Sequence, residues 1–289
     1  MKAIVVDPDR DTIQFTDITD PAYSDTSILI ETVYAGCNPV DWQLKVGQFR
    51  AAYTTIPFVL GWAVSGYQVT GAGRRRVVAY TRGPNSNITE IGTFSEYVAA
   101  PQDHVITCPD HLSLDVAAAY ALPAATAAQI IQALDDSLGI TLSSSKVLLN
   151  SQRGRVGQVL DSLLTVRGVK CQGPCKPTLA PFDVVVDLRG DLTVSGVTAI
   201  LKNGGTLVQV ASPDTSWSYH KRDPAINVLP IFAIPGNASL ELGLNTVRSD
   251  WGNLRGLKAS APPDAASSLS DAKGHEFGNS SVVQFRREF

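Results

Sequence analysis

Hydrophobic and polar residues alternate in short runs over the first hundred residues of the chain. Such alternation, with many β-branched and aromatic residues, is typical of strands that bury one face. Asp, Pro and Gly separate the runs, as turns require. The five clearest runs are KAIVV (2–6), TIQFTDI (12–18), SILIETVYAG (27–36), VVAY (77–80) and FSEYVAA (94–100). We therefore expect this part of the chain to be rich in β-structure.

Helical spacing begins at residues 112–136, where Ala and Leu recur at intervals of three and four residues. Pro123 lies inside this stretch, and a proline inside a helix removes a hydrogen bond and clashes with the preceding turn. The pattern therefore predicts two helices that meet near Pro123.

Strands and helices then alternate. Strands are expected at KVLLN (146–150), VKCQG (169–173), FDVVVDLRG (182–190) and GTLVQVAS (205–212), and helices at 154–168 and 193–204. This alternation predicts right-handed crossovers and a parallel, doubly wound sheet. The tail is a polar segment that ends in one strand, SVVQFRR (281–287).

The turn between the first of these strands and its helix has the composition of a phosphate-binding loop. It reads Ser151-Gln152-Arg153-Gly154-Arg155-Val156-Gly157. The first amides of a helix have no intrahelical acceptor and the helix dipole is positive there, so an anion is favoured. Glycines allow the backbone to turn tightly and to approach a pyrophosphate closely.

A purely structural explanation of the same loop is equally compatible with the residues. Gly154 could serve only a tight turn, and Gly157 could serve only close packing of the helix on the strand. Arg153 and Arg155 could bind phosphate directly, or they could reach across the hollow and block it. The sequence leaves both interpretations open.

Composition and charge exclude several classes of partner. The 289 residues, 44% of them hydrophobic, carry a net charge of −3, which gives no overall attraction to nucleic acid. The start, MKAIVVDPDRD, is unlike a signal peptide and no run of eighteen apolar residues occurs, so we expect a cytoplasmic protein without a membrane partner. The four cysteines and four histidines lack the spacing of a zinc site, so no metal is expected.

The order of these motifs resembles the medium-chain dehydrogenase/reductase superfamily, in its zinc-independent quinone oxidoreductase and enoyl reductase branch. The similar segments are 33–49, 56–66, 92–134 and SQRGRVG (151–157), which matches the branch's A-x-x-G-x-x-G loop except that Ser151 replaces Ala. The resemblance implies an α/β protein with a GroES-like β-barrel domain, residues 1–122 completed by 258–289. It also implies a shortened Rossmann-type domain with a doubly wound parallel sheet, residues 123–257.

Roles carried over from the resemblance place substrate and nicotinamide in a cleft between the two domains. The catalytic candidates on the barrel side are Asn38, Asp41, Gln43 and Lys45, and the candidate substrate pocket is Trp42, Phe49 and Trp62. The candidate contacts for NADPH are Thr126, Ser151, Arg153, Gly154, Arg155, Val156, Gly157, Val210 and Ala211. Asp41 and Lys45, four residues apart, could instead simply pair on a helical turn.

The chain departs from the family at three places. Gly61-Trp62-Ala63 stands where the zinc-dependent alcohol dehydrogenases have Gly-His-Glu, so no catalytic zinc is expected. Gln43 and Phe49 stand where relatives carry a tyrosine that supplies a proton. Between residues 173 and 182 only a short segment replaces the usual helix and strand, which removes part of the adenosine pocket. Lys170 or Lys176 could serve a 2′-phosphate, or could be plain surface residues.

Two functions from different classes remain open from the sequence. The first is an NADPH-dependent reductase of an activated C=C bond or a quinone-like small molecule, with water as the proton source. The second is a cyclase or isomerase of natural-product biosynthesis that uses the cleft without hydride transfer. Relatives often form homodimers through the edges of their Rossmann sheets, and residues 205–217 could take part in such a pairing.

Overall fold

The computed structural model describes residues 1–47, 56–70, 73–81, 92–173, 181–190, 192, 194–210, 226–231, 234–251, 257–271 and 281–286. Its contacts divide the chain into two compact units. The first contains Met1–Ala125 and Ile234–Phe289, and the second contains Thr126–Ala233.

Residues 234–257 group with the first unit, although the sequence boundaries assigned them to the second. Three contacts explain this. A Cβ on Gly243 would lie only 2.2 Å from the carbonyl oxygen of Ala124, so a helix packs directly on main chain there. His111 Nε2 lies 3.0 Å from the carbonyl oxygen of Val247, and the rings of Trp251 and Tyr120 are 5.6 Å apart.

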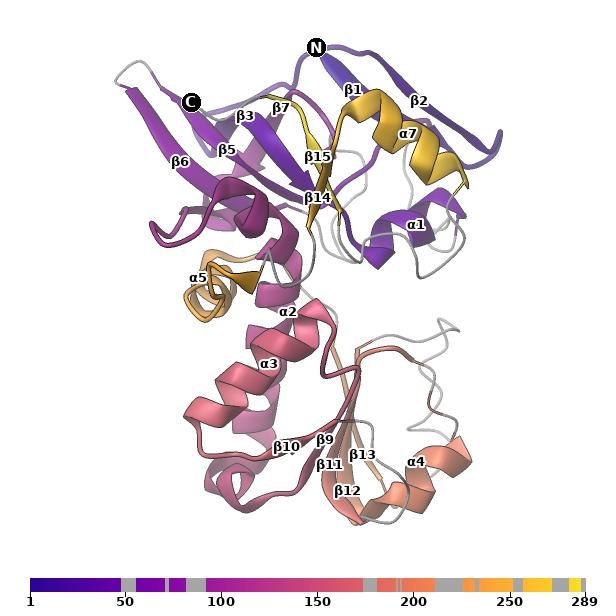
Figure 1. Ribbon diagram of the computed structural model, residues 1–289, viewed down its shortest axis with the longest axis vertical. Helices are drawn as coiled ribbons and strands as arrows, with labels where there is room; N and C mark the ends of the chain where they lie inside the picture. Colours follow the sequence, from indigo (N-terminus) through magenta and orange to yellow (C-terminus); the bar gives the residue numbers. More distant parts are fainter. Residues whose placement is uncertain are drawn as a thin grey trace. The chain divides into compact units, whose positions relative to one another are not determined.

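The first unit consists mainly of antiparallel sheet (Figure 1). A three-stranded sheet has the order β2-β1-β4, and a larger sheet has the order β14-β15-β3-β5-β6-β8, with β7 also paired to β3. The strands are β1 (Lys2–Asp7), β2 (Thr12–Asp17), β3 (Ser27–Gly36), β4 (Phe58–Val59), β5 (Ala63–Thr70), β6 (Gly73–Tyr80), β7 (Tyr97–Pro101), β8 (Val105–Thr107), β14 (Lys258–Ser260) and β15 (Ser281–Gln284). The C-terminal strand β15 thus joins a sheet built from the first hundred residues, where its Val282 lies opposite Gly36.

Alternation along these strands creates the core of the first unit. Inward-facing residues of five strands are fully or almost fully buried together: Ile30, Val64, Val77, Ala79, Val98, Ala100 and Val105. Short helices α1 (Pro39–Lys45), α5 (Asn237–Leu244) and α7 (Pro262–Asp271) complete the unit. Helix α7, which the polar composition of the tail did not predict, packs against β2 (Figure 1).

Helix α2 runs without interruption from Leu114 to Leu138, with Pro123 inside it. The prediction of two helices meeting at Pro123 is therefore wrong. Tyr120, Ala121 and Ala124, close to the proline, are at most 1% exposed, and this burial offsets the roughly 3 kcal/mol that an internal proline costs. By length and composition α2 could cross a membrane, but 83% of its most apolar window is buried inside the protein, as in a core helix.

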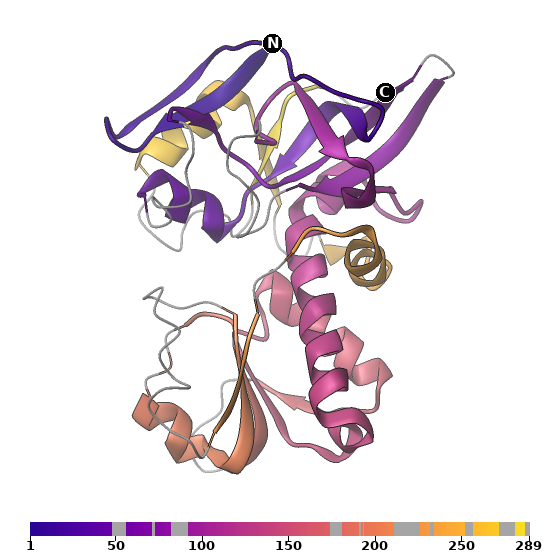
Figure 2. The same cartoon turned by 180° about the vertical axis from the view of Figure 1, so that it is seen from behind.

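The second unit contains a parallel sheet with the strand order β10-β9-β11-β12-β13. Its strands are β9 (Val147–Asn150), β10 (Cys171–Gln172), β11 (Phe182–Asp187), β12 (Leu201–Gln209) and β13 (Asn227–Pro230). Helices α2 and α3 (Arg155–Val166) lie on one face, and α4 (Val194–Ile200) lies on the other (Figures 1 and 2). The expected doubly wound parallel sheet is confirmed, and within the described residues it ends at the two-residue strand β10.

Helix α4 ends at Ile200, four residues earlier than the sequence pattern predicted. Leu201 already pairs with Phe182 of β11, and the register shifts before Thr206 pairs with Val184. Sheet pairing thus extends β12 backwards and shortens the helix. One apolar row crosses four strands on the face that carries α4 and packs on Val197. It consists of Leu148, Val185, Leu207 and Val228.

Candidate functional site

The carboxyl ends of β9 and β11 define the switch point of the parallel sheet, because the chain leaves β9 for β10 on one side and enters β11 on the other. Ligands of open parallel sheets bind outside such a point. Asn150, Asp187 and Gln209 occupy matching register positions at the ends of β9, β11 and β12. They therefore form a polar row on one face of the sheet. This row lies next to the apolar row that packs on α4, towards the carboxyl ends of the strands.

Asp187 is the centre of this row and is 2% exposed. Its Oδ1 accepts a hydrogen bond from Asn150 Nδ2 at 2.9 Å, from the amide of Arg189 at 3.2 Å and from the amide of Gly190 at 3.0 Å. Its Oδ2 accepts a longer one, 3.4 Å, from the amide of Leu192. The carboxylate therefore ties the start of the glycine loop to the loop that follows β11.

Gln209 is the last residue of the row, at the end of β12, and Val210 follows it. The Gln209 side chain is 1% exposed, and its Oε1 has no hydrogen-bond partner within the described residues. The amide of Val210 donates to the carbonyl oxygen of Asp187 at 3.1 Å. Val210 thus lies beside the carboxyl end of β11, whereas Ala211 lies outside the described residues.

The glycine loop turns sharply and then starts α3. Ser151 has a φ of 73°, a region that L-residues rarely adopt, and its carbonyl oxygen accepts a hydrogen bond from the amide of Gly154 at 2.8 Å. Gly154 is the N-cap residue of α3, and no side chain of the described residues caps the helix with a hydrogen bond. The first helical hydrogen bond of α3 runs from the amide of Gln158 to the carbonyl of Gly154. An uncapped helix start of this kind is suited to an anion.

Gly157 has a clear packing role in this loop. A Cβ at this position would lie 2.3 Å from the carbonyl oxygen of Ser151 and 2.6 Å from that of Gln152. Only glycine lets the first turn of α3 lie on the loop in this way. The structural explanation of Gly157 therefore holds whether or not a phosphate binds.

The remaining residues expected at the cofactor site lie on the same unit. Arg153 is exposed, whereas Arg155 and Val156 are half-buried at the first turn of α3. Thr126 is 3% exposed on α2.

The side chain of Gln152 braces the loop against α3 and β10. Its Nε2 donates to Asp161 Oδ1 at 3.0 Å, and a Cβ on Gly173 would lie 2.6 Å from its Oε1. Burial raises the pKa of the nearby Cys171 thiol to about 12, and the charge and hydrogen bond of Asp161 contribute to the same shift. Cys171 is therefore a neutral packing residue at ordinary pH. Lys170 is exposed, and Lys176 lies outside the described residues.

The predicted catalytic residues of the first unit lie along α1 or directly before it, and two of them cap the start of the helix. The amide of Asn38 donates to Asp41 Oδ2 at 2.8 Å, and Asn38 Nδ2 donates to the carbonyl oxygen of Gly36 at 3.0 Å. Both side chains are at most 1% exposed. Lys45 lies 3.3 Å from Asp11. The capping box gives Asn38 and Asp41 a structural explanation of their own.

The other residues expected near the substrate are distributed around this helix and β5. Trp42 and Gln43 are half-buried on α1, and Phe49 lies outside the described residues. Trp62, directly before β5, is 6% exposed and stacks on Tyr80 with a ring-centroid distance of 6.2 Å. Burial raises the pKa of the Tyr80 hydroxyl well above its usual range, so Tyr80 is a poor proton donor.

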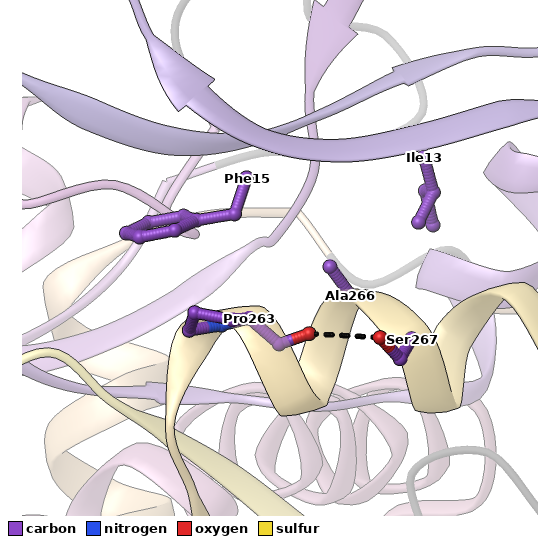
Figure 3. A pocket seen from close by; sticks show the side chains of 5 residues that line it. All are labelled: Ile13, Phe15, Pro263, Ala266 and Ser267. Carbon is purple, nitrogen blue, oxygen red and sulfur yellow. Dashed lines mark hydrogen bonds between the residues drawn. The ribbon is translucent and has the colours of Figure 1, made fainter.

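A hollow of about 430 Å³ lies between β2 and α7, apart from all of these residues. Figure 3 shows Ile13 and Phe15 opposite Pro263, Ala266 and Ser267. The one hydroxyl in its lining, Ser267 Oγ, already donates to the carbonyl oxygen of Pro263 at 3.2 Å. This lining offers little for chemistry. Among the residues that the structure describes, no group of three or more His, Cys, Asp or Glu side chains could hold a metal ion.

Sequence reasoning missed Asp187, Asn150 and Gln209 as members of the site. A signal was present, because each is a polar residue that ends an otherwise apolar strand. Only the register of the strands, however, shows that the three lie in one row.

Comparison with known proteins agrees with this fold. Residues 24–110 match the alcohol dehydrogenase GroES-like domain family. The structure is similar over 99% of both chains to the quinone oxidoreductase from Coxiella burnetii, with a TM-score of 0.75 and 19% identity. It is also similar to the yhdH oxidoreductase from Salmonella enterica, whose structure is a complex with NADP, with a TM-score of 0.70 and 14% identity over 99% of this chain and 100% of that one.

The chain is also similar in sequence to the trans-enoyl reductase thnE of Trichoderma harzianum. The two are 33% identical over 126 residues, which are 42% of this chain and 34% of that relative. The match thus spans about a third of the length of the relative. One segment of the chain thus matches a GroES-like domain family, and the similar proteins include a quinone oxidoreductase and a trans-enoyl reductase, in agreement with the resemblance seen in the sequence.

Proposed function

We propose that the protein is an NADPH-dependent reductase that acts on the C=C bond of an enone or on a quinone. The observation that carries this proposal is the uncapped start of α3 at the switch point of a parallel sheet. A Ser, Asp or Asn cap would stabilise the helix by only about a few tenths of a kcal/mol, whereas Gly154 has no side chain that competes with a ligand for the amides. The NADP complex of the structurally similar yhdH supports the choice of cofactor.

The residues of the second unit fit a dinucleotide in three respects. The amides of Arg155, Val156 and Gly157 precede the first helical hydrogen bond and would hold the diphosphate. The exposed Arg153 would add a cation beside it. The main chain at Val210, fixed by its hydrogen bond to Asp187, would contact the nicotinamide half. A bound nicotinamide nucleotide supplies a hydride for the substrate.

The proton that completes the reduction would come from water. Gln43 cannot act as an acid, and the pKa of Tyr80 is raised well above its usual range. Reduction of an enone by this route consumes one NADPH and one proton, and gives a saturated ketone and NADP⁺. Hydride adds to the β-carbon and the proton adds to the α-carbon.

The test is reduction of 2-cyclohexen-1-one and 1,4-benzoquinone, followed through the absorbance of NADPH. With NADPH that carries deuterium at the transferred position, we expect one deuterium at the β-carbon of the product ketone. With unlabelled NADPH in D₂O, we expect it at the α-carbon. At NADPH concentrations below its Kd, matched reactions with Gly154→Asp protein should consume NADPH about a hundredfold more slowly than those with Gly154→Asn protein.

The non-redox alternative makes the opposite prediction. A cyclase or isomerase would convert its substrate without any nucleotide, and would give NADPH consumption equal to the background with every enone and quinone tried. That result, together with no binding of NADPH, would contradict the proposal.

A further inference from the structure

Trp62 and Thr81 extend the hairpin of β5 and β6 by one residue on each strand. Ala63 of β5 pairs with Tyr80 of β6, and the amide of Thr81 donates to the carbonyl oxygen of Trp62 at 2.9 Å. The two residues thus occupy opposed positions on neighbouring strands. Directly opposed residues in antiparallel pairs have Cα atoms about 5 Å apart, so their side chains start from adjacent points.

Both side chains are buried, yet neither polar atom has a hydrogen-bond partner among the residues that the structure describes. Trp62 is 6% exposed and Thr81 is 7% exposed. Within the described part of the chain, Trp62 Nε1 and Thr81 Oγ1 make no hydrogen bond. A buried donor without an acceptor is uncommon in native proteins and calls for an explanation. Two of them on opposed residues point to a ligand that satisfies both.

The chemistry of the two groups restricts that ligand. The indole N–H is only a donor, so the ligand must present an acceptor to Trp62. A carbonyl oxygen has two lone pairs and can accept from an indole and a hydroxyl together. The nearby Thr93 hydroxyl does not compete, because it donates to the carbonyl oxygen of Ala63 at 3.0 Å.

We propose that Trp62 Nε1 and Thr81 Oγ1 donate hydrogen bonds to the carbonyl oxygen of the substrate. The proposal rests on the proposed reductase function and names the residues that polarise its substrate. As hydride forms a bond to the β-carbon, the π electrons of the C=C bond move towards the carbonyl and the oxygen gains negative charge. The two donors stabilise that charge, and water then protonates the α-carbon.

The indole resonances allow a test that needs no turnover. The chain has four tryptophans, and the cross-peak missing from Trp62→Phe protein identifies the Trp62 indole. Titration with 2-cyclohexen-1-one should move this peak downfield, and the shift should shrink in Thr81→Val protein. Cyclohexene, which lacks the carbonyl, should leave it in place. The indole of Trp251, which is buried elsewhere in the unit against Tyr120, serves as the internal control.

Steady-state kinetics of Trp62→Phe and Thr81→Val protein provide a second test. Thr81→Val keeps the shape of the residue and removes only the polar group, whereas Trp62→Phe also replaces the indole by a smaller ring. We expect both variants to fold and to keep the wild-type Kd for NADPH. Each should lower kcat/KM for 2-cyclohexen-1-one by about a hundredfold, mainly through kcat. Trp251→Phe should leave kcat/KM unchanged.

Two outcomes would overturn the proposal: a Trp62 indole that ignores the ketone, or variants that retain wild-type kcat/KM because a water molecule satisfies both groups. Failure of the proposed function is distinguishable from either. In that case the wild-type protein fails to bind NADPH, while the ketone titration still reports on the carbonyl site.

Discussion

Gly154 allows the charge at the start of α3 to be changed with little change in shape. Its φ of −66° and ψ of 161° are open to any L-residue. A Cβ there would lie 2.9 Å from Ser151 Oγ, which can rotate away, and 3.1 Å from the Ser151 carbonyl oxygen. Asp and Asn are equally good N-caps and nearly equal in size. Comparing Gly154→Asp with Gly154→Asn therefore isolates one negative charge.

The expected effect of that charge on cofactor binding is large, whereas its effect on folding is small. Either cap changes the free energy of unfolding of the apoprotein by only a few tenths of a kcal/mol relative to glycine. Two like unit charges 4 Å apart repel by about 4 kcal/mol at an effective dielectric constant of 20, and salt screens part of this. We expect the Asp variant to bind NADPH about a hundredfold more weakly than the Asn variant, or about 2.7 kcal/mol.

Isothermal titration with NADPH at low and high salt measures this difference directly. The ratio of the two Kd values should fall as salt rises, because the repulsion is electrostatic. Urea unfolding of both apoproteins provides the control for folding. If the Asp and Asn variants bind NADPH equally well, the diphosphate does not lie at this helix start, and the reasoning from the uncapped amides fails.

Two further predictions concern residues that support the site. Asp187→Asn should lower the free energy of unfolding in urea by about 2–3 kcal/mol, because an amide replaces the buried acceptor of several N–H groups. Asp264→Asn, at an exposed position, is the control. Equal stability of the two variants would contradict a stabilising role for the hydrogen bonds of the Asp187 carboxylate. Cys171, whose pKa is raised to about 12, should be alkylated by iodoacetamide far more slowly in folded than in urea-unfolded protein near pH 9.0, as read by peptide mass spectrometry. Because the folded pKa exceeds the unfolded one, the contribution of Cys171 to stability should be complete below pH 9.0 and should decline as the pH rises towards 12, a slope that Cys171→Ala should remove.

The sequence predicted the fold well where one periodicity dominates. The alternating runs became β1, β2, β3, β6 and β7, and the alternation of strands and helices after residue 146 became the parallel sheet. It failed where tertiary packing overrides local preference. Pro123 predicts a break, yet burial keeps α2 continuous, and strand pairing takes Leu201 from the expected helix into β12.

The candidate site was predicted only in part, for a related reason. The glycine loop is a local feature, and Ser151, Gly154 and Gly157 lie at the start of α3 as expected. The row of Asn150 and Asp187 depends on the register of strands that are distant in sequence. Trp62 and Thr81 have opposed polar atoms without a hydrogen-bond partner in the described part of the chain, and this too depends on hairpin pairing and burial, which no sequence pattern reveals.

The central claim is that the start of α3 holds the diphosphate of NADPH, and thermal unfolding of the wild-type protein with and without the nucleotide tests it most directly. NADPH at a hundred times its Kd should raise the free energy of unfolding by about 2.7 kcal/mol. Nicotinamide mononucleotide, which lacks the diphosphate, should give little change. An unfolding temperature that does not move with saturating NADPH would contradict the account.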